Sequence, residues 1–71
     1  MKYLILTRVK KIFGNEMIYW EIRTLRENTW ITLTNGYQQF DNHSDAMSAG
    51  KKHLLNDTQI ANEEEISYLQ I

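Results

Sequence analysis

The sequence predicts an α+β domain: a small antiparallel β-meander of three to four strands, one α-helix packed on one face, and a C-terminal strand (β-β-β-β-α-β). Three observations carry this prediction. Residues 2–40 are rich in β-branched and aromatic side chains that alternate with polar ones. Asn35-Gly36 separates two such runs, and this dipeptide favours a two-residue hairpin turn. Capping residues and a stripe at helical spacing follow Phe40.

The 71 residues form a single domain, 1–71. The chain has no Cys, which excludes disulfides and thiolate metal sites. No apolar run approaches the ~18 residues that span a bilayer. The apolar start is interrupted by Arg8, Lys10 and Lys11, which is unlike a signal peptide. We therefore expect a cytoplasmic protein that does not enter membranes.

The first strand is expected over Lys2 to Ile12, inside the sheet, because its first half is apolar on both sides. Gly14-Asn15 is expected to form a two-residue loop before a second strand from Met17 to Leu25. That loop places Val9 opposite Trp20 and Arg8 opposite Glu21.

A second turn is expected over Leu25 to Asn28, and it pairs Thr24 with Thr29. The Asn35-Gly36 turn then pairs Ile31 with Phe40. The three registers agree, because each places large apolar residues on the same face. The predicted core face contains Ile5, Val9, Ile18, Trp20, Ile22, Ile31, Leu33 and Phe40.

A helix is expected to open near Ser44, capped by Ser44 or Asn42, and to run to about Leu55 or Asn56. Its inner stripe is Ala46, Met47, Ala49, Gly50, His53 and Leu54. Asp57 to Glu65 is polar and is expected to form a loop with at most one helical turn. Ile66 to Ile71 is expected to be the last strand, with either Ile66 and Tyr68 or Leu69 and Ile71 facing the core.

The sheet face opposite the helix carries the candidate site. Trp, Tyr and Arg are the side chains that most often anchor protein interfaces, and Arg23 is expected opposite Trp30 at cation–π distance. The simplest alternative is an ordinary solvated face stabilised by cross-strand pairs such as Arg8–Glu21. The predicted partner-binding residues are Arg8, Lys10, Tyr19, Arg23, Trp30 and Tyr37.

Nucleic acid is the alternative partner for the same face, because cations alternate with aromatic rings. Residues 1–26 hold six Lys/Arg and two Glu, whereas residues 27–71 hold two Lys and seven Asp/Glu. This asymmetry indicates a polarised surface. The three-strand meander and helix over Lys2 to Leu55 also resemble, in outline, small DNA-binding modules of integrase type. That resemblance implies a sheet face that reads a groove.

No pattern of residues points to catalysis, a cofactor or a metal. His43 and His53 are ten positions apart, which matches no metal-binding spacing. Helix capping explains Asp41 and Asp45 better than a calcium loop does. No Ser or Thr has a convincing His/Asp set beside it, and the three Gly form no phosphate loop. We therefore expect a non-enzymatic protein.

Eight Ile and six Asn against three Ala and no Pro are typical of AT-rich genomes. A small phage or mobile-element inhibitor or adaptor of a host protein fits this bias and the size of the chain. The apolar Leu69-Gln70-Ile71 carries a strand edge, and a small chain without disulfides gains by closing such an edge against a copy of itself. We therefore expect a homodimer.

Overall fold

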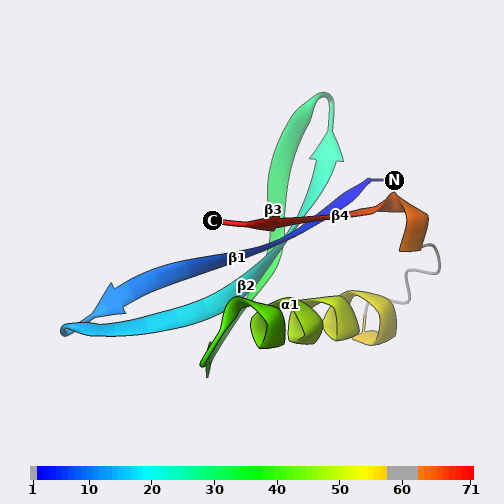
Figure 1. Cartoon of the computed structure of the whole chain (residues 1–71). Helices are drawn as coiled ribbons and strands as arrows, with labels where there is room; N and C mark the ends of the chain where they lie inside the picture. Colours follow the sequence, from blue (N-terminus) through cyan, green and yellow to red (C-terminus); the bar gives the residue numbers. More distant parts are fainter. Residues whose placement is uncertain (1, 58–62) are drawn as a thin grey trace.

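The computed structural model describes residues 2–57 and 63–71, and it confirms the α+β prediction. One four-stranded sheet has the order β3-β2-β1-β4; β1, β2 and β3 are antiparallel neighbours, and β4 runs parallel to β1 (Figure 1). Residues 58–62 of the expected loop lie outside the described residues. The elements are β1 (Tyr3–Ile12), β2 (Asn15–Arg26), β3 (Thr29–Phe40), α1 (His43–Lys52), the π-helical η1 (His53–Asp57), the 3-10 helix η2 (Glu63–Glu65) and β4 (Ile66–Gln70).

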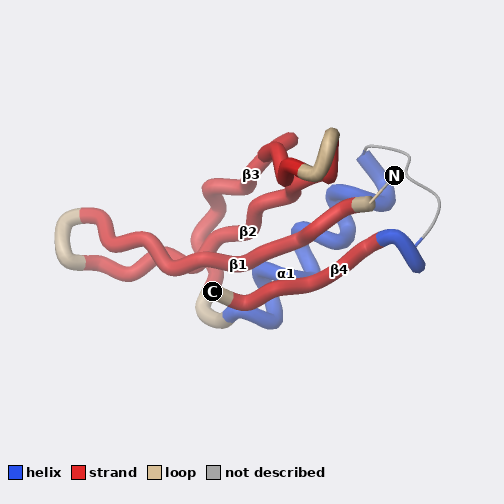
Figure 2. Tube along the Cα trace, turned by 90° about the horizontal axis from the view of Figure 1, so that it is seen from above, coloured by secondary structure: helices blue, strands red, loops and turns tan. Residues whose placement is uncertain are grey.

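The core lies between the sheet and α1, which crosses one face of it (Figure 2). β1 lies inside the sheet, as its apolar first half predicts. In β4 it is Ile66 that enters the core, while Tyr68 and Leu69 are exposed. The buried cluster is Tyr3, Ile5, Trp20, Ile22, Leu54 and Ile66, with Phe40, Met47, Ala49 and Leu55 packed against it.

The helix begins at His43 because Asn42 caps it: the Asn42 side chain accepts a 2.8 Å hydrogen bond from the backbone N–H of Asp45. Its inner stripe lies on the sheet as predicted. Small residues allow this close approach, since a Cβ on Gly50 would lie 3.0 Å from Cγ2 of Ile5. Helical structure continues through η1 to Asp57, about where the sequence predicts the end.

The first hairpin turns one residue earlier than predicted, at Phe13-Gly14 instead of Gly14-Asn15. Phe13 has φ 50° and Gly14 has φ 81°, the positive values that a tight two-residue turn of this kind requires. The register therefore moves by two residues, so that Arg8 lies opposite Tyr19 instead of Glu21. A shift of two keeps every side chain on its predicted face.

The second hairpin turns at Glu27 and Asn28, which have φ 50° and φ 63°. Arg26 pairs with Thr29 and Thr24 with Ile31, again two residues from the predicted register. Trp30 consequently stays on the side of the sheet away from α1, as predicted, but its neighbour on β2 is different.

The predicted turn at Asn35-Gly36 is wrong, because β3 continues through both residues to Phe40. Gly36 is the cross-strand partner of Trp20, and a Cβ there would lie 2.5 Å from Cζ2 and Nε1 of the indole. The glycine therefore lets a ring lie against the backbone of the neighbouring strand, a second common role of glycine in sheets.

The predicted core is also too large: Val9, Ile31 and Leu33 are exposed. The 10 residues of α1 span about 15 Å. The 12 residues of β2 span about 36 Å from the first to the last Cα atom. Both hairpins therefore extend past the helix. Leu33 is exposed for a second reason. The register shifts between Ile22 and Arg23, so that Leu33 is an extra residue between Thr32 and Thr34 without a partner on β2.

Candidate interaction surface

The sheet side away from α1, here called the uncovered face, is formed by alternate residues of all four strands. Figure 1 shows the β2–β3 hairpin rising on this side, opposite to α1, so that it flanks the face. At its centre Leu6 is fully buried, with Glu21 beside it on β2 and Leu69 beside it on β4. The larger side chains of the face are Leu4, Leu6, Arg8, Lys10, Tyr19, Glu21, Arg23, Leu25, Trp30, Thr32 and Leu69.

An ion pair fixes the polar part of this centre. Arg23 Nε donates a 2.5 Å hydrogen bond to Oε2 of Glu21, whose side chain is only 7% exposed. A carboxylate this deeply buried needs such a partner, because desolvation penalises an unpaired charge. Arg23 is therefore held against the sheet by Glu21. The predicted Arg8–Glu21 pair is wrong, because the first hairpin turns one residue earlier than predicted and Arg8 lies opposite Tyr19.

Five of the six predicted site residues lie on one face, in two groups. Arg8 and Tyr19 are direct cross-strand partners, and Lys10 follows Arg8 on the same side of β1. Trp30 lies at the other end, 40% exposed and opposite Leu25. Arg23 is opposite Thr32, so the predicted Arg23–Trp30 pairing is also wrong. The Tyr37 side chain lies outside what the structure describes, although its backbone belongs to β3.

The sequence pattern places Leu4 and Leu6 on this face, but it misses Leu25 and Leu69. Leu69 is 46% exposed and lies next to Leu6, because β4 pairs with β1 in parallel. Leu4 and Leu25 are half-buried nearby. Parity along β1 and β2 places Leu4 and Leu25 on this face, but no sequence signal gives the strand beside which β4 lies. The centre of the face therefore combines three apolar neighbours, Leu4, Leu6 and Leu69, with the Arg23–Glu21 ion pair.

The β1–β2 hairpin, residues Arg8–Tyr19, is here called the arm. It extends beyond the N-terminal end of α1, and its tip projects from the rest of the chain in both views (Figures 1 and 2). Its base pairs with β3, where Ile18 lies opposite Phe40. Phe13 at its tip is 100% exposed. On the side facing away from α1 it carries Arg8 and Lys10, and on the other side Lys11 lies 4.0 Å from Glu16.

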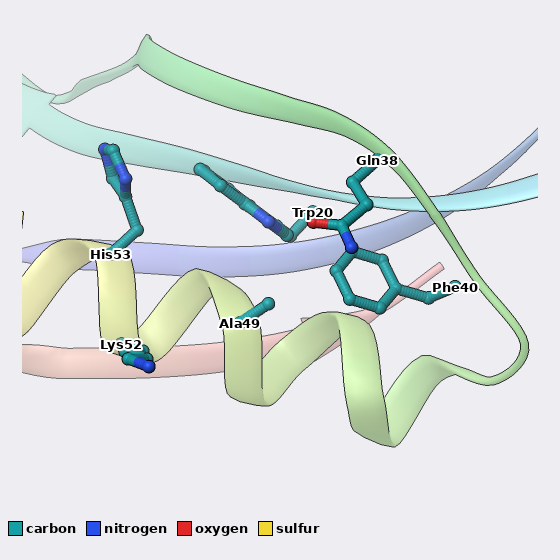
Figure 3. Close-up of a pocket in the computed structure, with 6 residues that line it drawn as sticks. All are labelled: Trp20, Gln38, Phe40, Ala49, Lys52 and His53. Carbon is teal, nitrogen blue, oxygen red and sulfur yellow. The ribbon is translucent and has the colours of Figure 1, made fainter.

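A shallow depression of about 430 Å³ lies between α1 and β3 (Figure 3). The Trp20 and His53 rings lie side by side there, with centroids 5.0 Å apart. Ala49 forms its floor, and Gln38 and Lys52 bring polar groups to it. These lining residues include no Ser, Cys, Asp or Glu to act as a nucleophile or carboxylate base.

Residues 2–57 and 63–71 hold no cluster of three or more His, Asp or Glu that could bind a metal ion. Within the same ranges, no helix is long and apolar enough to cross a bilayer. His43 is instead hydrogen-bonded through Nδ1 to Oγ1 of the buried Thr7 at 2.7 Å, which ties the start of α1 to the sheet.

Comparison with known proteins finds no family model, no curated protein and no solved structure that matches this chain.

Proposed function

We propose that this chain is a small, non-enzymatic, cytoplasmic protein-binding module that binds its partner through the uncovered face. The observation that carries the proposal is the exposure of Trp30 and Leu69 on a sheet face with an apolar centre. Antiparallel sheets commonly leave one face to solvent, but that face is then polar. Exposed aromatic and aliphatic side chains with polar groups around them are typical of protein interfaces.

The ion pair at the centre favours a protein over a nucleic acid for this part of the face. Arg23 already neutralises Glu21, so its charge is committed within the fold. Phosphate binding needs free cations, whereas an apolar protein contact gains from a guanidinium whose position is fixed. An inhibitor or adaptor acts through such a contact alone, which is consistent with the absence of a catalytic residue set around the depression in Figure 3.

We also propose that the chain forms a homodimer. β4 is an edge strand, and Ser67 to Gln70 contains no charged residue and no Pro. Charges and Pro are the features that keep edge strands from pairing with other chains.

The test of the binding proposal uses two adjacent residues of equal exposure on opposite faces. Trp30 is 40% exposed on the uncovered face, and Ile31 is 41% exposed on the face that α1 covers in part. The tagged chain is used to capture proteins from the lysate of a low-GC bacterium, and the captured protein is identified, purified and titrated. We expect Trp30→Ala to weaken its binding by about 2 kcal/mol or more.

Ile31→Ala serves as the matched control and should bind like the unaltered chain. Equal losses for the two variants would contradict binding through the uncovered face. Circular dichroism of both variants shows whether the fold is intact, so that a loss of binding is not a loss of structure.

A further inference from the structure

Phe13, at the tip of the arm, is unfavourable both in its backbone conformation and in its exposure to solvent. Phe13 adopts φ 50°, a left-handed conformation that costs a bulky L-residue about 1–2 kcal/mol. The first position of such a turn favours Asn or Asp before Gly. Phe13 is also 100% exposed, so its ring gains nothing from burial within the chain. A strained, exposed aromatic residue points to a contact outside the molecule.

The charge on the arm differs in sign from that of the remainder. The arm contains Arg8, Lys10, Lys11 and Glu16, a formal charge of +2, whereas the whole chain carries −1 and the remainder therefore −3. A polyanion is therefore attracted more strongly to the arm than to the remainder of the chain.

Two cations on one side of the arm lie within reach of its aromatic tip. On the side away from α1, Arg8 faces Tyr19, Lys10 faces Met17 and Ile12 faces Asn15, while Phe13 lies in the turn. Residues two apart on a strand are separated by about 6.6–6.8 Å, so Arg8 and Lys10 can contact different phosphates of one strand. Single strands present unpaired base faces to such rings.

We propose that the arm binds single-stranded nucleic acid, with Phe13 stacking on a base and with Arg8 and Lys10 contacting phosphates. A duplex is disfavoured, because inserting Phe13 between paired bases requires unstacking a base step, and the three cations of the arm supply little to offset it. This contact goes beyond the proposed protein-binding function and shares no test variant with it. A chain that binds nucleic acid through the arm and a protein through the rest of the uncovered face would act as an adaptor.

The probe is a fluorescein-labelled oligothymidine, compared with a duplex of mixed sequence, by fluorescence anisotropy at several salt concentrations. We expect the single strand to bind at low salt, with a log–log salt slope no steeper than about −1.4 for two phosphate contacts. Phe13→Asn should weaken binding by about fivefold to 150-fold, the range for losing one stacked base.

Phe13→Asn also provides a readout that a purely structural residue would not give. Asn-Gly suits the turn better than Phe-Gly, so the variant should melt several degrees higher while it binds less. Leu33→Asn, which removes an exposed apolar side chain outside the arm, is the control and should leave the affinity unchanged.

Three results would overturn the proposal: no binding of the oligothymidine by the unaltered chain at low salt, equal affinity of Phe13→Asn and the unaltered chain, or a duplex that binds as tightly as the single strand. Absence of binding would leave Phe13 as an anchor for a protein partner instead.

Discussion

At the scale of single residues, the pair Trp20 and Gly36 decides how the sheet is built. Trp20 is 8% exposed, and its indole lies against Gly36 on the next strand. Covering a strand glycine with a ring protects backbone that would otherwise face solvent, and it buries a large apolar side chain. The dipeptide Asn35-Gly36, whose local sequence favours a turn, is therefore an internal part of β3 in the folded chain, with Gly36 against the core residue Trp20.

Gly36→Ala should destabilise the protein by about 1–3 kcal/mol, because the new Cβ overlaps the Trp20 ring and overpacks the site. Urea denaturation followed by circular dichroism measures the loss.

A smaller ring at position 20 provides the control for this prediction. In the Trp20→Phe background, Gly36→Ala should cost less, since coupled neighbours give non-additive effects. Equal costs in both backgrounds would show that Gly36 is needed for another reason, such as the path of β3.

The two tryptophans should differ in both stability and exposure. Trp20→Ala removes a buried ring and should cost about 3–5 kcal/mol, much of what a small domain possesses, so the variant should be unfolded. Trp30→Ala should lose about 1 kcal/mol of cross-strand packing against Leu25 at most. Iodide should quench the fluorescence of Trp30 and spare that of Trp20; the reverse pattern would mean that the two faces are exchanged.

At the scale of elements, side-chain parity is the part of the fold that the sequence predicts well. Both hairpin registers are two residues from the prediction, yet Trp20 still points toward α1 and Trp30 away from it. A shift of two costs little in the hydrophobic pattern, whereas a shift of one would exchange the two faces. Alternation along a strand therefore determines its faces without determining the turn residues.

The positions of the turns are not determined by the preferences of the turn residues alone, because these compete with the pairing of the two strands. Gly14 lies in the first turn, but Phe13 accompanies it instead of the more suitable Asn15. The two-residue turn leaves Ile12 paired with Asn15 and Lys11 with Glu16. Long-range pairing thus outweighs the local preference of one turn residue.

The alternation of side chains along each strand is enough to predict which residues lie on the candidate face. Arg8, Lys10, Tyr19, Arg23 and Trp30 all lie on the predicted face. Their partners were not predictable, because the partners depend on register. Leu69 was missed because a parallel neighbour is reached through a long connection, and no local pattern indicates which strand it will join.

At the scale of the whole molecule, the chain is elongated, with extents of 37 × 24 × 16 Å. The helix covers only the middle of the sheet, so the arm and the β2–β3 hairpin both project from a small core (Figure 1). A domain of this size buries only about 60% of its unfolded surface, which makes its stability marginal. Further burial between copies of the chain would therefore contribute noticeably to the stability of the fold.

The homodimer prediction concerns the outer edge of β4. Antiparallel pairing of β4 with its copy about a two-fold axis would join two sheets into one and bury Tyr68, which is 46% exposed. Light scattering at ~100 μM, where weak association is visible, should give twice the mass of the chain. Tyr68→Lys places a charge at the edge and should give a monomer, whereas Ile31→Lys, on the distant hairpin, should leave the dimer intact. A monomeric mass for the unaltered chain at this concentration would rule out pairing along β4.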